Sequence, residues 1–311
     1  MIHESFEIDI DYEKLGLKHD CKKATITTYI KDSYPNDQDK FNRPLIVIFP
    51  GGGYHHHSVR EAEPIAIKMM DYGFNAIVVR YSLMPNTYPC QLYEACAAMK
   101  YVRDNVAKWD TNPDNIVIAG FSAGAHVAGL LGTKWNTREV DPILKELNCD
   151  REYIKPNKMM LGYPVISSGE CAHRASFERL IYGGTKNELE GQRLEGIAGQ
   201  DGDLTGGMLT GDRDYLYEEL SLEKCVTKDT PTTFLWHTFS DASVPVKNSL
   251  LMAESLEANN IPFEYHVFPK GHHGSALGTR ETASKNLGHY EPSLAIWTKM
   301  FRNFVLGEIV L

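Results

Sequence analysis

The stretch Asn115-Ile116-Val117-Ile118-Ala119-Gly120-Phe121-Ser122-Ala123-Gly124 decides the fold, because an apolar run leads directly into a serine between two glycines. The run before Gly120 has the composition of a buried strand, and the residues after Ser122 continue as a helical pattern. A strand that turns into a helix at Gly-x-Ser-x-Gly holds the serine in strained backbone geometry and presents its hydroxyl above the sheet. The flanking glycines leave room for the strand and the helix to approach closely. The stretch therefore predicts an α/β sheet with Ser122 at the end of one strand.

Short apolar runs alternate with longer helical patterns along the rest of the chain. Runs such as Leu45–Phe49 are apolar throughout, as expected for strands buried on both faces of a parallel sheet. The alternation predicts βαβ units and a mostly parallel central sheet with helices on both faces. The expected strands are 24–30, 45–49, 75–81, 115–119, 158–162, 232–237 and 263–268, and the expected helices are 61–72, 88–108, 122–134, 246–259 and 292–305.

Residues 183–214 depart from this pattern, because they are rich in Gly, Glu, Gln and Asp and poor in apolar residues. A segment of this composition has too little apolar surface for a core of its own, so we interpret it as a polar insertion or partial lid. The prediction is a single domain over residues 1–311. Whether the insertion closes over a substrate stays open.

The composition narrows the partners and the compartment. The 311 residues carry a formal net charge of −9, which disfavours nucleic acids and anionic membrane surfaces as partners. No apolar run reaches the roughly 20 residues that a membrane-spanning helix needs, and the acidic N-terminus lacks the pattern of a signal peptide. The six cysteines are spread without a Cys-x-x-Cys pair, which is typical of reduced thiols. We expect a cytoplasmic protein, with export by a signal outside this sequence as the alternative.

Ser122 needs a base to act as a nucleophile, because a serine alkoxide is unstable at neutral pH. The base in turn needs a carboxylate to orient it, and in this strand–turn–helix setting the chain order should be Ser, Asp or Glu, then His. Asp241 follows the strand at 232–237, and His272 and His273 follow the strand at 263–268. The order and the places at strand ends predict Ser122, Asp241 and one of these two histidines as a catalytic triad.

Other acidic and imidazole side chains fit the pattern less well. Asp212 and Asp214 lie in the polar segment instead of at a strand end, and His237 and His266 lie inside strand patterns. We therefore interpret the two histidines as structural and keep the two aspartates as weaker rivals of Asp241.

These residues together resemble the α/β-hydrolase superfamily, and more closely the bacterial esterases that include acetyl-xylan and feruloyl esterases and their hormone-sensitive-lipase-like relatives. The resemblance covers nearly the whole chain. It implies that His273, which directly precedes a glycine, is the catalytic histidine. Pro50 stands where hormone-sensitive-lipase-like members usually carry histidine, which places the chain nearer the sugar-ester branch. The matching motifs are Phe49–Tyr54, Arg80–Leu83, Gly120–Gly124, Ser240-Asp241 with Val244-Pro245, and Gly271–Gly274.

The glycines after the strand at 45–49 complete the expected mechanism. The backbone N–H groups of Gly52, Gly53 and Ala123 are predicted to bind the oxyanion that forms when Ser122 attacks an ester carbonyl. Acyl transfer of this kind needs no metal and no organic cofactor.

His55, His56 and His57 follow the glycines directly. Consecutive residues rarely converge on one metal ion, so we expect no metal site there. The alternatives are a loop at the mouth of the pocket, with Tyr54 and His57 as candidate substrate contacts, or solvent-exposed residues without a role.

The expected substrate is a small ester, above all an acetylated sugar or xylo-oligosaccharide, as the resemblance implies. Within enzymes the alternatives are a generic short-chain carboxylesterase, an arylformamidase or an oligopeptidase, although no room exists for the access-limiting domain of a peptidase. From another class, the fold could serve only to bind a ligand, without catalysis. The sequence leaves open whether the chain forms a homo-oligomer.

Overall fold

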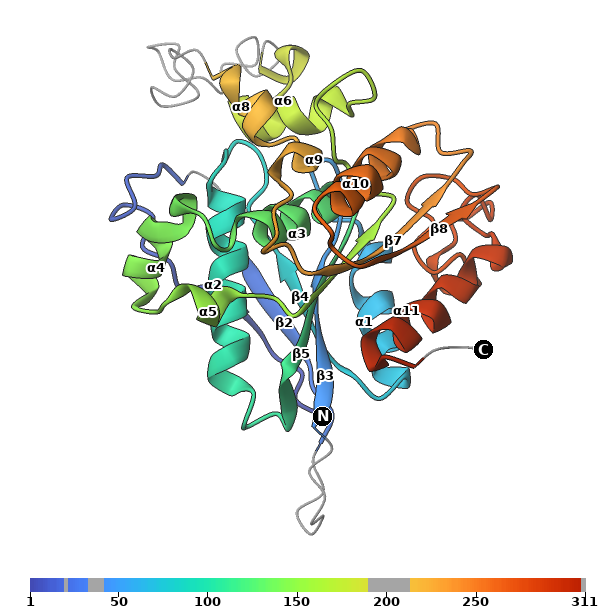
Figure 1. Cartoon of the computed structure of the whole chain (residues 1–311), viewed down its shortest axis with the longest axis horizontal. Helices are drawn as coiled ribbons and strands as arrows, with labels where there is room; N and C mark the ends of the chain where they lie inside the picture. The colour runs from blue at the N-terminus through green and yellow to red at the C-terminus, as the bar shows by residue number, and fades with distance from the viewer. Residues whose placement is uncertain (20–21, 33–41, 190–212, 309–311) are drawn as a thin grey trace.

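The computed structural model describes residues 1–19, 22–32, 42–189 and 213–308, and these residues form an eight-stranded sheet in the order β1-β2-β4-β3-β5-β6-β7-β8 (Figure 1). Strands β1 and β2 pair antiparallel at one edge, and the strands from β4 to β8 along that order pair in parallel. The strands are β1 (Ser5–Glu7), β2 (Thr25–Tyr29), β3 (Arg43–Phe49), β4 (Asn75–Arg80), β5 (Thr111–Phe121), β6 (Lys158–Gly162), β7 (Thr232–Thr238) and β8 (Phe263–Phe268). The sheet confirms the expected fold class.

Helices cover both faces of the sheet, because its central strands are apolar on both sides. On β3, Leu45, Val47 and Phe49 belong to one core while Ile46 and Ile48 belong to the other, and all five are fully buried. Figure 1 shows α2, α3 and α10 on one side of the sheet and α1 and α11 on the other. The helices are α1 (Glu63–Asp71), α2 (Cys90–Asn105), α3 (Ala123–Lys134), α4 (Asp141–Leu147), α5 (Arg151–Ile154), α6 (Arg174–Tyr182), α8 (Tyr215–Glu219), α9 (Leu222–Cys225), α10 (Lys247–Ala258) and α11 (Ile296–Leu306).

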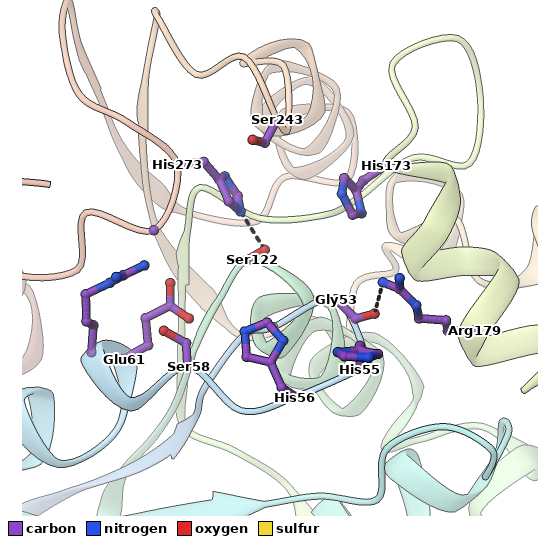
Figure 2. A pocket seen from close by; sticks show the side chains of 13 residues that line it. Gly53, His55, His56, Ser58, Glu61, Ser122, His173, Arg179, Ser243 and His273 are labelled. Atoms are coloured by element: carbon purple, nitrogen blue, oxygen red, sulfur yellow. Dashed lines mark hydrogen bonds between the residues drawn. The ribbon is translucent and has the colours of Figure 1, made fainter. Parts of the chain in front are cut away.

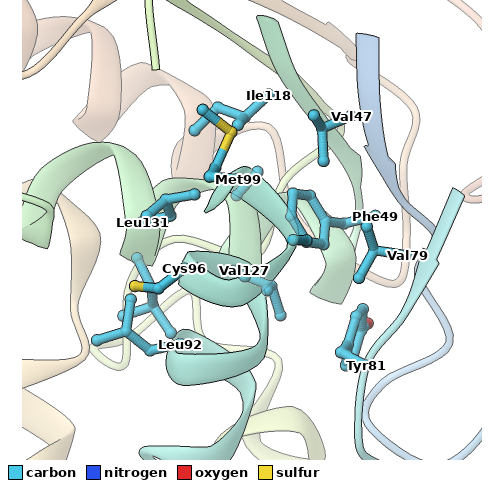
Figure 3. Close-up of a cluster of buried hydrophobic side chains, with 14 of the residues drawn as sticks. Val47, Phe49, Val79, Tyr81, Leu92, Cys96, Met99, Ile118, Val127 and Leu131 are labelled. Atoms are coloured by element: carbon cyan, nitrogen blue, oxygen red, sulfur yellow. The ribbon is translucent and has the colours of Figure 1, made fainter. Parts of the chain in front are cut away.

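The core between the sheet and helices α2 and α3 packs α3 against β5, the strand that precedes it. Figure 3 shows Met99 of α2 and Val127 and Leu131 of α3 in one buried cluster with Val47 and Ile118 of the sheet. Burial of side chains of this size contributes about 1.5–3 kcal/mol each. This packing fixes the start of α3 relative to the end of β5.

All seven expected strands are present within a few residues of their expected ends, and so are the five expected helices. The sequence analysis missed β1, because three residues with exposed ends carry no apolar run. It also missed the short helices α4, α5, α6, α8 and α9. The expected insertion at 183–214 lies mostly outside the described residues, so its nature stays a prediction.

Two expectations from the composition concern the thiols and the membrane. The five cysteines in the described ranges are free, and burial raises the pKa of the Cys96 thiol well above its usual value. No helix in these ranges is both long enough and apolar enough to cross a bilayer.

The carboxyl ends of the parallel strands meet at one edge of the sheet. The loop after β3 carries the three glycines, Ser122 follows β5, Tyr163 follows β6, Asp241 follows β7 and His273 follows β8. In open α/β sheets this edge is where ligands bind.

Candidate active site

The turn between β5 and α3 holds Ser122 in a conformation that few residues other than glycine adopt, with φ 54° and ψ −122°. The two neighbouring glycines are required by space. A Cβ on Gly120 would lie 2.2 Å from the Gly124 carbonyl oxygen, and a Cβ on Gly124 would lie 2.1 Å from the Phe49 carbonyl oxygen. The Ser122 backbone N–H donates to the Gly162 carbonyl oxygen at 3.0 Å, which fixes the turn to β6.

Ser122, His273 and Asp241 form one hydrogen-bonded chain. Ser122 Oγ lies 2.7 Å from His273 Nε2 (Figure 2), and His273 Nδ1 lies 2.7 Å from Asp241 Oδ2. An ionised carboxylate only accepts, so Nδ1 carries the proton and Nε2 accepts from the serine hydroxyl. The structure thus brings together the three residues expected from the sequence, in the arrangement of a nucleophile, a base and an orienting acid.

The Asp241 carboxylate is held ionised in a buried place, with only 6% of the residue exposed. Burial alone would raise its pKa, but hydrogen bonds from His237 and His273 outweigh burial and hold the pKa well below its usual range. The second oxygen, Oδ1, accepts from the backbone N–H groups of Ser243 and Val244 at 2.9 Å each. His237, interpreted as structural from the sequence, places its Nε2 3.4 Å from Asp241 Oδ2 and so stabilises the ionised carboxylate.

Gly52 and Gly53 line the cavity beside Ser122 and His273. Their φ angles are 127° and 62°, and a Cβ on Gly52 would lie 1.9 Å from the His56 carbonyl oxygen. Ala123 is the first residue of α3, where a backbone N–H has no acceptor within the helix. Among the described residues no acceptor is recorded for the N–H groups of Gly52, Gly53 and Ala123. Their assignment to the oxyanion stays a prediction.

A buried carboxylate joins the glycine loop to the rest of the site. Glu61 is 2% exposed, and its Oε2 accepts from the Gly51 backbone N–H at 2.8 Å. Its Oε1 accepts from the Tyr163 hydroxyl at 2.7 Å, and the Tyr163 ring packs edge-on against His273 with centroids 5.1 Å apart. The Tyr163 hydroxyl also accepts from the Ala276 backbone N–H at 3.2 Å. Glu61 and Tyr163 therefore connect the loops after β3, β6 and β8.

Arg179 of α6 holds the glycine loop from the other side. Its Nη1 donates to the Gly53 carbonyl oxygen at 3.1 Å, while Nε and Nη2 bind the Glu188 carboxylate at 2.6–3.1 Å. The Arg179 hydrogen bonds lower the pKa of Glu188 to about 2. No sequence motif indicated Arg179. Its partner Gly53 is distant in the chain, and its partner Glu188 lies in a helical stretch that was not expected.

The cavity above Ser122 has a volume of about 360 Å³ and is mostly lined by polar side chains. His55 and His56 line it, with Ser58, His173 and Arg179 (Figure 2), and so does Arg60. No group of three or more His, Cys, Asp or Glu side chains in the described ranges is arranged to hold a metal ion.

The structure corrects the two expected pocket residues, Tyr54 and His57, neither of which lines the cavity. Tyr54 has φ 61° and turns into the core, where it is 1% exposed and its hydroxyl lies 2.7 Å from His126 Nδ1. His57 packs edge-on against Tyr81 at 4.9 Å, and burial lowers its pKa to about 4. The tight turn at the glycines reverses the chain, so its first exposed side chains are those of His55 and His56.

The chain is similar to known proteins along most of its length. The BD-FAE family model matches residues 32–176, which include the glycine loop and Ser122, and the prolyl oligopeptidase family model matches residues 205–291, which include Asp241 and His273. The chain is 30% identical over 248 residues to endo-1,4-beta-xylanase B of Butyrivibrio fibrisolvens, covering 78% of this chain and 34% of that protein. It is also 30% identical over 238 residues to the acetylxylan esterase of Xylanibacter ruminicola, covering 75% of this chain and 41% of that protein. The chain thus spans less than half the length of these two relatives.

Several solved structures match over nearly the full length of both chains. One of them is the acetyl ester-xyloside bifunctional hydrolase from Caldicellulosiruptor lactoaceticus, with 31% identity, a TM-score of 0.74, and coverage of 99% of this chain and 97% of that chain. The protein therefore belongs to the BD-FAE family of carboxylic-ester hydrolases, within the α/β-hydrolase superfamily.

Proposed function

We propose that this protein is a serine esterase that removes acetyl and other short acyl groups from small sugars, such as acetylated xylo-oligosaccharides. The observation that carries the proposal is the hydrogen-bonded chain from Ser122 through His273 to Asp241, which opens into a small polar cavity. The names of two relatives, an acetylxylan esterase and an acetyl ester-xyloside hydrolase, support the acetyl group and the sugar as substrate features.

In the first step, Ser122 Oγ attacks the ester carbonyl carbon while His273 Nε2 takes the hydroxyl proton. Asp241 keeps the Nδ1 proton in place and stabilises the imidazolium that forms. The negative charge on the carbonyl oxygen is met by the N–H groups of Gly52, Gly53 and Ala123. These donors are fixed before the substrate arrives, so they need no reorganisation in the transition state.

In the second half of the reaction, His273 gives its proton to the departing alcohol. Water then attacks the acyl-enzyme, with His273 again as the base, and releases the carboxylic acid and free Ser122. Every proton transfer in this sequence uses a group of the chain itself.

The cavity favours a small, hydroxyl-bearing substrate over a lipid. Its volume of about 360 Å³ lies near the lower end for ligand pockets, and its lining offers imidazole, guanidinium and hydroxyl groups instead of an apolar channel. Hydroxyl groups of a sugar could pair with such side chains, whereas a long acyl chain would leave them unpaired.

The test is a hydrolysis panel of acetylated xylo-oligosaccharides, feruloyl esters and nitrophenyl esters of increasing acyl length. We expect the highest kcat/KM on acetyl esters and loss of at least about 10³-fold in Ser122→Ala. A fluorophosphonate probe separates an esterase from a protein that only binds ligands, since it labels an activated serine. An unlabelled Ser122, or unchanged turnover in Ser122→Ala, would contradict the proposal.

A further inference from the structure

We propose that Arg60 anchors an anion-binding subsite in the catalytic cavity, so that this enzyme favours small esters that carry a carboxylate group. The inference rests on the proposed function, because the subsite would hold the ester for attack by Ser122. The juxtaposition that carries it is an arginine without a protein partner in the same cavity as Ser122 and His273.

Arg60 forms no recorded hydrogen bond or ion pair with any residue in the described part of the chain, and its buried Nε has no acceptor. The Nε of this partly buried residue is withdrawn from water without a partner, which costs free energy because nothing replaces the lost hydration. An arginine that lines a cavity in this state is ready to bind an anion from solution.

The adjacent carboxylate of Glu61 lies near Arg60 but forms no ion pair with it: a Cβ on Gly274 would lie 3.5 Å from Arg60 Nη2 and 3.7 Å from Glu61 Oε1. Both oxygens of Glu61 are engaged, one by the Gly51 N–H and the other by the Tyr163 hydroxyl. These bonds aim the carboxylate at the loops after β3 and β6, and no ion pair with Arg60 results. The Glu61 carboxylate therefore holds the loops after β3 and β6 in place.

The guanidinium of Arg60 lies beside the catalytic histidine loop. Its Nη2 is 3.5 Å from the position that a Cβ on Gly274 would take, and Gly274 directly follows His273. Burial lowers the pKa of His289, and the nearby Arg60 charge lowers it further. The buried His289 Nδ1 also has no hydrogen-bond partner among the described residues. The absent side chain at Gly274 leaves space on this side of the cavity.

The second arginine of the cavity has a different role. Arg179 donates to the Gly53 carbonyl oxygen and to the Glu188 carboxylate. Its charge is therefore already paired, and fewer of its N–H groups can bind a ligand. Arg60 keeps the N–H donors of Nη1 and Nη2, and two such donors match the two oxygens of a carboxylate. We therefore infer that the substrate class is an acylated acidic sugar or another small ester with a carboxylate.

A matched pair of substrates tests the subsite directly. 4-Acetoxybenzoate and 4-acetoxybenzamide have nearly the same shape, but only the first is charged at neutral pH. We expect the ratio of their kcat/KM values, acid over amide, to fall about tenfold in Arg60→Gln, the size expected for a charge-assisted hydrogen bond. Arg60→Lys should retain part of the ratio, and Arg174→Gln, exposed on α6, should leave it unchanged. An unchanged ratio in Arg60→Gln overturns the inference.

Binding without turnover separates this proposal from the proposed function. In Ser122→Ala, calorimetry with 4-hydroxybenzoate and 4-hydroxybenzamide should show tighter binding of the acid, and adding Arg60→Gln should remove the difference. Equal binding of both in Ser122→Ala overturns the subsite even if the wild-type protein hydrolyses nitrophenyl acetate. Failure to hydrolyse any acetyl ester, with the binding difference intact, overturns only the esterase function.

Discussion

The Tyr163 hydroxyl donates to Glu61 Oε1 at 2.7 Å and so ties the residue after β6 to the carboxylate that holds the glycine loop. The same tyrosine packs its ring on His273. One side chain therefore touches both the base and the support of the expected oxyanion donors, without belonging to the triad.

Tyr163→Phe should lower kcat/KM about tenfold while the protein still folds. The substitution keeps the ring against His273 but leaves a buried Glu61 oxygen without its donor, at a cost of about 1–3 kcal/mol. Steady-state kinetics and thermal unfolding measure the two effects. Tyr29→Phe on β2, outside the cavity lining, is the matched control. Equal activity in Tyr163→Phe and wild type would show that the bridge does not position the site.

Gly52→Ala should abolish most activity, whereas Gly16→Ala should not. Both glycines have positive φ angles, 127° and 68°, so both substitutions carry backbone strain. Only at Gly52 would the new Cβ collide, at 1.9 Å from the His56 carbonyl oxygen, because nothing lies within 4 Å at Gly16. The measurement is the initial rate of nitrophenyl acetate hydrolysis by each variant. Circular dichroism first checks that both variants are folded. Similar losses in both variants would assign the effect to strain alone.

Arg179→Gln should reduce kcat about tenfold with a smaller change in KM. The substitution removes the donor to the Gly53 carbonyl oxygen and the ion pair with Glu188, so the loop loses its support from α6. Because Arg179 is the main cause of the lowered pKa of Glu188, the substitution also moves that pKa back toward its usual value, and the carboxylate stays ionised at neutral pH. Arg174→Gln on the same helix serves as the control. A change confined to KM would instead make Arg179 a substrate-binding residue.

Glu94 should make the protein less stable as the pH rises from about 4.5 to about 7. Burial raises the pKa of this carboxyl to about 7, although hydrogen bonds from Ser82 and Tyr12 oppose the shift. The folded state then keeps a proton that the unfolded state releases above pH 4.5. The contribution to stability is complete below that pH and is lost as the pH passes through about 7.

Urea unfolding at several pH values measures this dependence, with a slope on the order of 1 kcal/mol per pH unit from Glu94. Glu94→Gln, which cannot ionise, should flatten the profile over this range. Glu254→Gln, exposed on α10, should leave it unchanged. A profile in Glu94→Gln that is parallel to the wild type would contradict the assignment.

The sequence predicted those parts of the site that depend on order along the chain. Each parallel strand is visible in the sequence as an apolar run, and the loops after these strands lie at the same edge of the sheet. Ser122, Asp241 and His273 could therefore be expected to lie close together. The strand–turn–helix stretch around Ser122 requires its glycines, and the structure gives the steric reason at Gly124 and the Phe49 carbonyl oxygen.

Residues that act through partners distant in sequence could not be found this way. Glu61 appeared only as the start of a helix, because its role depends on Tyr163, one hundred and two positions later. Tyr54 was misplaced for a related reason, since its neighbours in sequence line the cavity while its own positive φ turns it to His126. Pattern reasoning places elements, whereas the direction of a loop side chain follows from three-dimensional contacts.

The position of β8 at the edge of the sheet has a consequence for how activity is lost. β8 pairs along one side with β7 and carries His273 in the loop that follows it, while Ser122 sits on the central β5. Edge elements open at lower free energy than central ones. Under mild denaturation the base should leave the nucleophile before the sheet comes apart, so inactivation would precede the loss of secondary structure.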